Sequence, residues 1–126
     1  MGVLFLVLLS VGALTACGTT PPGSITFGSA ENPETTFRLD EEIAWIAFLP
    51  EPVEDTSVNL VISPSGSDSE LFGYRQFITD PGTTTLVNEM PLGRFLPDPG
   101  VYVMRYVSTD GEVLAEGEFE LIADSN

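Results

Sequence analysis

Proline and glycine interrupt this sequence too often for a long helix to form after residue 16. The 126-residue chain holds 10 prolines and 12 glycines, and every proline lies beyond residue 20. No stretch there keeps an apolar period of 3.6 residues over several turns without meeting one of them. The apolar residues instead form short runs at roughly 8–15 residue spacing, a pattern typical of all-β domains. We therefore predict a single antiparallel β-sandwich of about seven strands.

The apolar runs define the predicted strands. Ile43–Leu49 is wholly apolar, so we expect it to be a central strand that is covered on both faces. In the next run Val58, Leu60 and Ile62 alternate with polar or smaller residues and should point inward. The predicted strands are Ser24–Phe27 with Thr35–Leu39 as a split first strand, Ile43–Leu49, Ser57–Ser63, Glu70–Ile78, Thr83–Val87, Val101–Val107 and Glu112–Ile122.

The last two runs predict a β-hairpin. Thr109-Asp110-Gly111 between them is a hairpin turn signal. In the final run the apolar positions, including Phe119 and Leu121, alternate with three glutamates. A slip of one residue would bury those carboxylates, so the register should be firmly set.

The N-terminus carries a second pattern, which indicates where in the cell the protein is located. Residues 2–16 are nearly all apolar, but they fall short of the roughly 20 residues that span a bilayer and match the h-region of a secretory signal peptide. They end in Leu14-Thr15-Ala16-Cys17, which resembles the lipobox of bacterial lipoproteins: an aliphatic residue, two small residues and a Cys. The resemblance implies cleavage before Cys17 and a lipid, with acyl chains such as palmitate, on its thiol. An uncleaved anchor or a buried Cys are the alternatives.

These features divide the chain into three parts. Residues 1–16 are the predicted signal peptide, residues 17–23 the lipidated Cys and a flexible Thr/Pro/Gly tether, and residues 24–126 the β-domain. The resemblance places the protein in the cell envelope, lipid-anchored to a bacterial membrane, with the domain facing the periplasm or the exterior. By analogy with lipoproteins of Gram-negative bacteria, Gly18 after the Cys favours the outer membrane.

A further resemblance concerns the fold. Leu96-Pro97-Asp98-Pro99-Gly100-Val101-Tyr102, followed by Arg105, resembles the LxPGxYxxR start of strand F in immunoglobulin-like and fibronectin-III-like sandwiches, with one extra residue before the Pro-Gly. It implies that Tyr102 forms a tyrosine corner, its phenol bonded to the backbone just upstream. Met104 lies where antibody domains carry a Cys, so no inter-sheet disulfide is implied. Trp45 is the expected core aromatic.

Composition excludes several function classes. The chain has no His, no Lys and one Cys, so it can form no Ser-His-Asp or Cys-His nucleophile, no P-loop and no Schiff base. Its net charge of −15 argues against nucleic acid as a partner, because phosphate binding needs Lys and Arg. We predict that the protein is not an enzyme and needs no cofactor.

The acidic residues are the candidate ligands for a cation. Carboxylates in loops can bind Ca²⁺, although no DxDxDG motif is present. The candidates are Asp40, Glu41, Glu42, Glu54 and Asp55. The alternative reading is a solvated acidic surface that keeps the domain soluble and monomeric.

Aromatic residues on Glu70–Ile78 are the other candidates. Phe72, Tyr74 and Gln76 should share one face, which could be a sugar-stacking platform or a protein contact if it is exposed. We expect instead that Phe72 and Tyr74 fill the core.

The sequence as a whole predicts a lipid-anchored, non-catalytic binding or structural module with a possible protein partner in the envelope. The alternative is an accessory domain that binds Ca²⁺ or carbohydrate.

Overall fold

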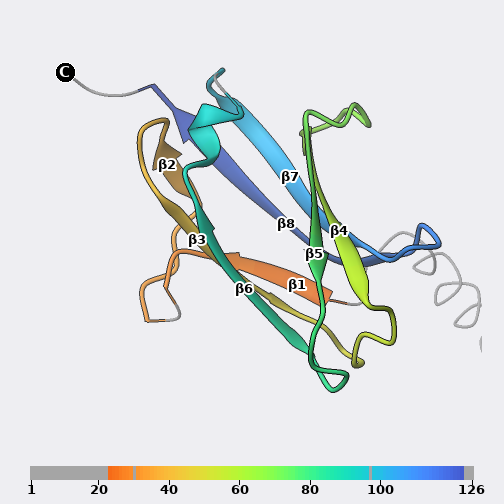
Figure 1. The fold of residues 1–126 in the computed structure, drawn as a ribbon. Coiled ribbons are helices and arrows are strands. Elements are labelled where there is room, and N and C mark those ends of the chain that lie inside the picture. Colours follow the sequence, from red (N-terminus) through yellow and green to blue (C-terminus); the bar gives the residue numbers. More distant parts are fainter. Residues whose placement is uncertain (1–22, 30, 97, 124–126) are drawn as a thin grey trace, which may run out of the picture.

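The computed structural model describes residues 23–29, 31–96 and 98–123 (Figure 1). Within these residues it shows strands and one short 3-10 helix, and the prediction of an all-β fold is confirmed. The elements are β1 (Gly23–Phe27), β2 (Thr36–Arg38), β3 (Ile43–Phe48), β4 (Ser57–Pro64), β5 (Phe72–Phe77), β6 (Thr85–Met90), η1 (Leu92–Arg94), β7 (Gly100–Val107) and β8 (Val113–Ile122).

The strands form one curled sheet, in the order β5-β4-β7-β8-β1-β3-β6 (Figure 1). β2 lies off this path and pairs with β8. Most neighbours are antiparallel, but β8 pairs in parallel with both β1 and β2. The sheet is therefore mixed, and the expectation of purely antiparallel pairing was wrong. The reason is the split first strand, whose two halves both lie beside the last strand.

A tight turn separates the two halves of that first strand. Gly28 adopts a positive φ of 82° and forms an isolated bridge with Pro33. The Glu34 amide donates to the Phe27 carbonyl at 3.0 Å, which closes the loop. A side chain at position 28 would be strained in this conformation, so the turn depends on glycine.

Strand β3 corrects one prediction. Ile43, Trp45 and Ala47 are fully buried, whereas Ala44 and Ile46 on the other face are only half-buried and Phe48 is 48% exposed. The wholly apolar run therefore has one covered face rather than two. β3 lies between β1 and β6 in the sheet, but no second layer covers its outer face among the described residues.

Strand β6 begins later than expected and runs further. The expected strand was Thr83–Val87, whereas the structure has Thr85–Met90. Thr83 belongs to a turn, because its amide and hydroxyl both donate to the Asp80 carbonyl. Pairing with β3 then continues to Met90, opposite Ile43.

The β7–β8 hairpin is as predicted. Tyr102 lies opposite Phe119 and Arg105 opposite Glu116 in an antiparallel register that shifts only near the turn, between Tyr106 and Val107. Ala115, Phe119 and Leu121 are buried, while Glu118 and Glu120 are exposed. The alternation of the sequence therefore sets which face of β8 meets the core.

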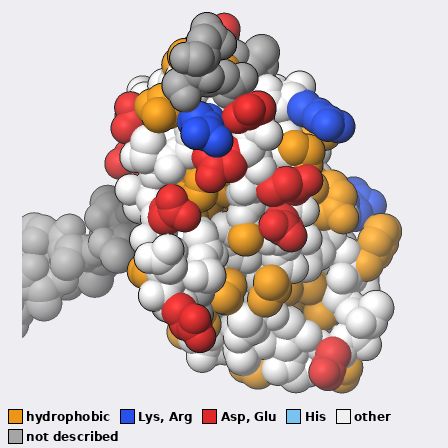
Figure 2. All heavy atoms as spheres, turned by 90° about the vertical axis from the view of Figure 1, so that its left-hand side faces the viewer, with side chains coloured by type: hydrophobic (Ala, Val, Ile, Leu, Met, Phe, Trp, Pro, Cys, Tyr) orange, Lys and Arg blue, Asp and Glu red, His pale blue; other side chains and the backbone are white. Residues whose placement is uncertain are grey.

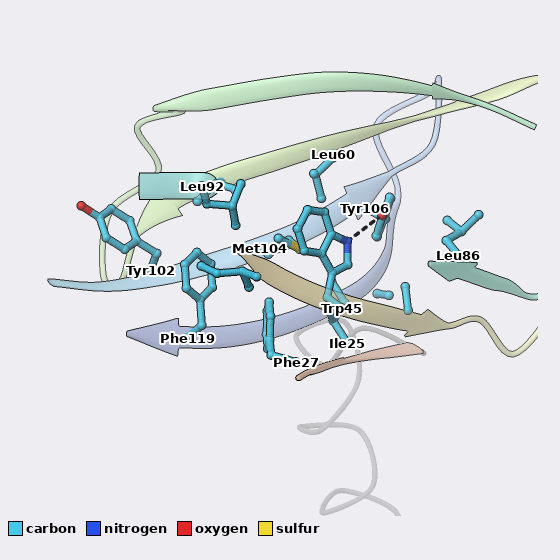
Figure 3. Packing of buried hydrophobic residues seen from close by; sticks show 14 of the residues in the cluster. Ile25, Phe27, Trp45, Leu60, Leu86, Leu92, Tyr102, Met104, Tyr106 and Phe119 are labelled. Carbon is cyan, nitrogen blue, oxygen red and sulfur yellow. Dashed lines mark hydrogen bonds between the residues drawn. The ribbon is translucent and has the colours of Figure 1, made fainter. Parts of the chain in front are cut away.

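The inner face of the curled sheet holds a single core (Figure 3). Trp45 lies at its centre and is fully buried. The Phe119 ring packs between Phe27, with ring centroids 5.1 Å apart, and Tyr102, at 5.8 Å. Val58, Leu60 and Ile62 of β4 point inward and are fully buried, as predicted.

Candidate functional site

The two predicted structural residues lie in the core. Tyr102 is 5% exposed, and its hydroxyl donates to the Asp98 carbonyl at 2.5 Å, four residues upstream. This is the bond expected of a tyrosine corner. Burial, followed by the charge of Asp98, raises the pKa of Tyr102 above its usual value of 10.0. The Trp45 indole N–H is satisfied by the Tyr106 hydroxyl at 3.0 Å (Figure 3).

Tyr106 is the residue that sequence reasoning missed. Its hydroxyl accepts from Trp45 Nε1 and from Asn88 Nδ2 at 3.1 Å, and it donates to Gln76 Oε1 at 3.2 Å. Asn88 Nδ2 also donates to Gln76 Oε1 at 2.7 Å. Burial raises the pKa of Tyr106, while the bonds from Trp45 and Asn88 act in the opposite direction. The alternation in Val101–Val107 could have placed Tyr106 inward, where a buried indole N–H needs an acceptor.

This network joins the two borders of the sheet. Gln76 belongs to β5 and Asn88 to β6, the first and last strands in the sheet order. Their side chains meet through the 2.7 Å bond, and Tyr106 of β7 binds both. The curl of the sheet is therefore held by side-chain hydrogen bonds at this point rather than by a backbone ladder.

The predicted cation ligands lie at two separate ends of the molecule. Asp40 lies 3.6 Å from the Arg38 guanidinium, and Glu41 accepts from the Arg38 amide at 2.9 Å, close to the end of β8. Asp55 accepts from the Thr109 hydroxyl at 3.1 Å, at the hairpin before the start of β8. The full length of the ten-residue strand β8 separates these two places. Glu42 and Glu54 are exposed.

No group of three or more His, Cys, Asp or Glu side chains converges on a metal position within residues 23–29, 31–96 and 98–123. Acidic side chains are scattered over the face seen in Figure 2, with apolar side chains between them. This distribution matches the reading of a solvated acidic surface. The remaining predicted site residue, Cys17, lies outside the described residues.

A small acidic pocket of about 150 Å³ lies between the loop after β3 and the β7–β8 hairpin. Leu49, Val53 and Leu114 contribute apolar surface, and Glu51 and Glu112 contribute carboxylates. Glu54 and Asp55, two of the predicted cation ligands, also line this pocket. No pattern in the sequence indicates that the hairpin lies beside them, because the two segments are far apart along the chain. The N-terminal end of β1 lies beside it, since a Cβ on Gly23 would touch the Leu114 carbonyl.

Strand β5 divides its aromatic residues differently from the prediction. Phe72 is half-buried against the core and packs on Phe95, with ring centroids 4.9 Å apart. Tyr74, which we expected in the core, is 42% exposed, so that expectation was wrong for this residue. The face opposite to theirs carries the more exposed side chains, Leu71 at 50% and Phe77 at 70%. β5 and the residue before it therefore carry three exposed large apolar side chains, Leu71, Tyr74 and Phe77.

Comparison with known proteins finds no family model and no curated sequence that matches the chain. Within the part of the chain that the structure describes, no helix is long and apolar enough to cross a bilayer. Function is therefore inferred from the residues and their geometry.

Proposed function

We propose that this chain is a lipoprotein of the bacterial cell envelope whose β-domain is a non-catalytic binding or structural module. The observation that carries the proposal is the sequence Leu14-Thr15-Ala16-Cys17, in which the single Cys of the chain follows an apolar run at the position a lipobox requires. Two or more acyl chains, each contributing about 0.8 kcal/mol per buried CH₂, hold a protein stably on a membrane.

The position of Gly23 supports a tether at one end of the domain. β1 begins at Gly23, which pairs with Ala115 near the start of β8. This is the end that carries the acidic pocket and the β7–β8 hairpin. Anionic headgroups repel carboxylates such as Glu51 and Glu112, so the domain would stand off the bilayer on its tether.

The proposal includes an immunoglobulin-like arrangement of the strands. β1, β3 and β6 would form one layer and β4, β5, β7 and β8 the other, with the core between them. The bond from Tyr102 to the Asp98 carbonyl supports this arrangement. Strands of the two layers that face each other about 10 Å apart across the core would agree with this arrangement, whereas an open sheet without facing strands would contradict it.

Labelling with a palmitate analogue tests the anchor. The full chain and two variants, Cys17→Ser and Thr19→Ser, would be produced in a bacterial host that processes lipoproteins. We expect label and detergent-phase partitioning for the wild type and for Thr19→Ser, which makes an equally small change two residues away. Cys17→Ser should lose the label. An unlabelled wild type, or label that persists in Cys17→Ser, would refute the lipoprotein assignment.

A further inference from the structure

Strand β5 has a free backbone edge. It ends the sheet order, and β4 is its only partner strand among the described residues (Figure 1). The Ile78 amide donates to the Thr56 carbonyl at 2.8 Å, in register with the β4–β5 pairing. Because hydrogen-bonded and non-hydrogen-bonded pairs alternate, the amides and carbonyls of Gly73, Arg75 and Phe77 point away from β4.

The strand itself carries little protection at this edge, because Arg75 is its only charged residue. Natural edge strands are usually blunted by Pro, Lys, bulges or a covering segment. Phe72–Phe77 contains no Pro and no Lys, and its pairing with β4 is continuous from Phe77 opposite Ser57 to Phe72 opposite Ile62. Its residues Gly73, Tyr74, Arg75 and Phe77 are all exposed. The edge can therefore accept another strand.

A hollow of about 370 Å³ lies beside the edge on the outer face of the sheet. Gly73 leaves it open, because glycine has no side chain there, and Asn59 and Val61 of β4 contribute to its lining. The Glu70 carboxylate lies over Gly73, where it would touch a Cβ. Glu70 forms no ion pair within the described residues. Arg75 also lines the hollow, but it forms no ion pair with Glu70 among the described residues. The Glu70 carboxylate is therefore still available to an incoming cationic side chain.

The negative charge of the chain determines which kind of segment can bind at the edge of β5. A second copy of the chain would bring together two molecules that each carry a net charge of −15. The chain's own residues 1–22 contain no Lys or Arg to meet Glu70. A partner segment that carries a basic side chain satisfies both the free backbone groups and the carboxylate.

We propose that the free edge of β5 binds an extended, basic segment of a partner protein by strand addition, with one Lys or Arg of that segment in the hollow beside Gly73. Main-chain hydrogen bonds supply affinity in this mode, and side-chain pockets supply specificity. The inference rests on the proposed function, because it names the partner class of the binding module.

Fluorescence anisotropy with the full chain in neutral detergent tests the proposal. The probe is a fluorescein-labelled peptide of sequence TVKVTV, and TVEVTV is its charge control. We expect saturable binding of the Lys peptide and at least tenfold weaker binding of the Glu peptide. Two further peptides carry N-methyl groups on odd or on even residues. Only one of them should lose binding, because an added strand points only alternate amides at β5.

Protein variants locate the site. Glu70→Gln should remove most of the preference for Lys, a change of about tenfold as expected for a charged hydrogen bond. Glu112→Gln, which changes the net charge equally at the opposite end of the domain, should bind as the wild type. Arg75→Pro removes an edge amide without touching the β4 ladder and should abolish binding, with circular dichroism as the check on folding.

Other outcomes overturn the proposal. Equal losses in Glu70→Gln and Glu112→Gln would mean general charge attraction, and equal losses with both N-methylated peptides would mean that no strand is added. Lack of any binding, or self-association of the chain through β5, would also refute it. Palmitate labelling is independent of these results, so failure of the anchor and failure of the β5 site can be told apart.

Discussion

The β7–β8 hairpin and the edge strand β5 use similar residues in opposite ways. Each contains a Phe, a Gly, a Tyr and an Arg. In the hairpin Phe119 is 1% exposed, Tyr102 is 5% exposed and Arg105 pairs with Glu116 at 2.7 Å. In β5 Phe77 is 70% exposed, Tyr74 is 42% exposed, and Arg75 has no ion pair among the described residues.

The difference shows that the position of a strand in the sheet decides whether its apolar residues are buried in the core or exposed to water. β8 has β7 at one edge and β1 and β2 at the other, and Ala115, Phe119 and Leu121 on its inner face are buried in the core. β5 has one neighbour, and most of its side chains remain in contact with water. The hairpin residues therefore contribute to stability, whereas those of β5 remain available for binding. Substitutions at matched residue types can break or sharpen this contrast.

The largest difference in the free energy of unfolding should come from the phenylalanine substitutions in the two regions. Phe119→Ala leaves a cavity between Phe27 and Tyr102 and should lower the free energy of unfolding by about 3–5 kcal/mol. Phe77→Ala removes an exposed ring and should change it by no more than about 0.5 kcal/mol. Urea unfolding measures both. Similar losses for the two variants would mean that β5 is covered in solution.

Glycine gives the next contrast. A Cβ on Gly117 would lie 2.7 Å from the Ile25 carbonyl oxygen and 3.0 Å from the Phe27 ring, so Gly117→Ala should cost about 1–3 kcal/mol through overpacking. At Gly73 the nearest obstacle is the flexible Glu70 carboxylate, which can move. Gly73→Ala should therefore leave the thermal midpoint nearly unchanged. A large loss at Gly73 would show that the hollow is more rigid than its exposure implies.

Tyrosine follows. Tyr102→Phe removes the bond to the Asp98 carbonyl and should cost about 1 kcal/mol, as for a typical partly buried hydrogen bond. Tyr74→Phe, on exposed β5, should be neutral in the same denaturation assay. If both variants prove neutral, the corner bond makes no net contribution to stability.

The same hydroxyls predict a dependence on pH. The pKa values of Tyr102 and Tyr106 are raised in the folded state, mainly by burial. Above a pH of about 10 the unfolded chain therefore binds fewer protons than the native chain, and stability falls as pH rises. Unfolding midpoints measured from neutral to alkaline pH should show this decline. The decline should be shallower in Tyr102→Phe, and an unchanged slope would contradict the assignment.

The arginine substitutions should have the smallest effect on stability. Arg105→Gln breaks a partly exposed ion pair with Glu116 and should cost about 0.2–1 kcal/mol at low salt, and less at high salt. Arg75→Gln should produce no measurable change in stability, although it alters the charge of the β5 edge. Double-mutant cycles with Glu116→Gln at two salt concentrations would isolate the pair.

Much of the fold was predictable from local pattern. The alternation in the last strand, the Thr109-Asp110-Gly111 turn and the inward residues of β4 all follow from a period of two and from turn chemistry, which depend on neighbouring residues alone. The inward position of Trp45 also followed from the sequence. The predicted metal ligands were not brought together, because carboxylates that lie close in sequence, such as Asp40 and Glu42, extend from solvated loops.

The sequence by itself determined an all-β chain with an acidic surface, its buried tyrosine and tryptophan, and the motif on which the lipid anchor is proposed. Only the tertiary structure decided which strands lie at the borders of the sheet, and so which aromatic residues are exposed. It also decided that Gln76, Asn88 and Tyr106 meet across those borders. The physical reason is that alternation assigns a side chain to a face, whereas its burial depends on which distant strand covers that face.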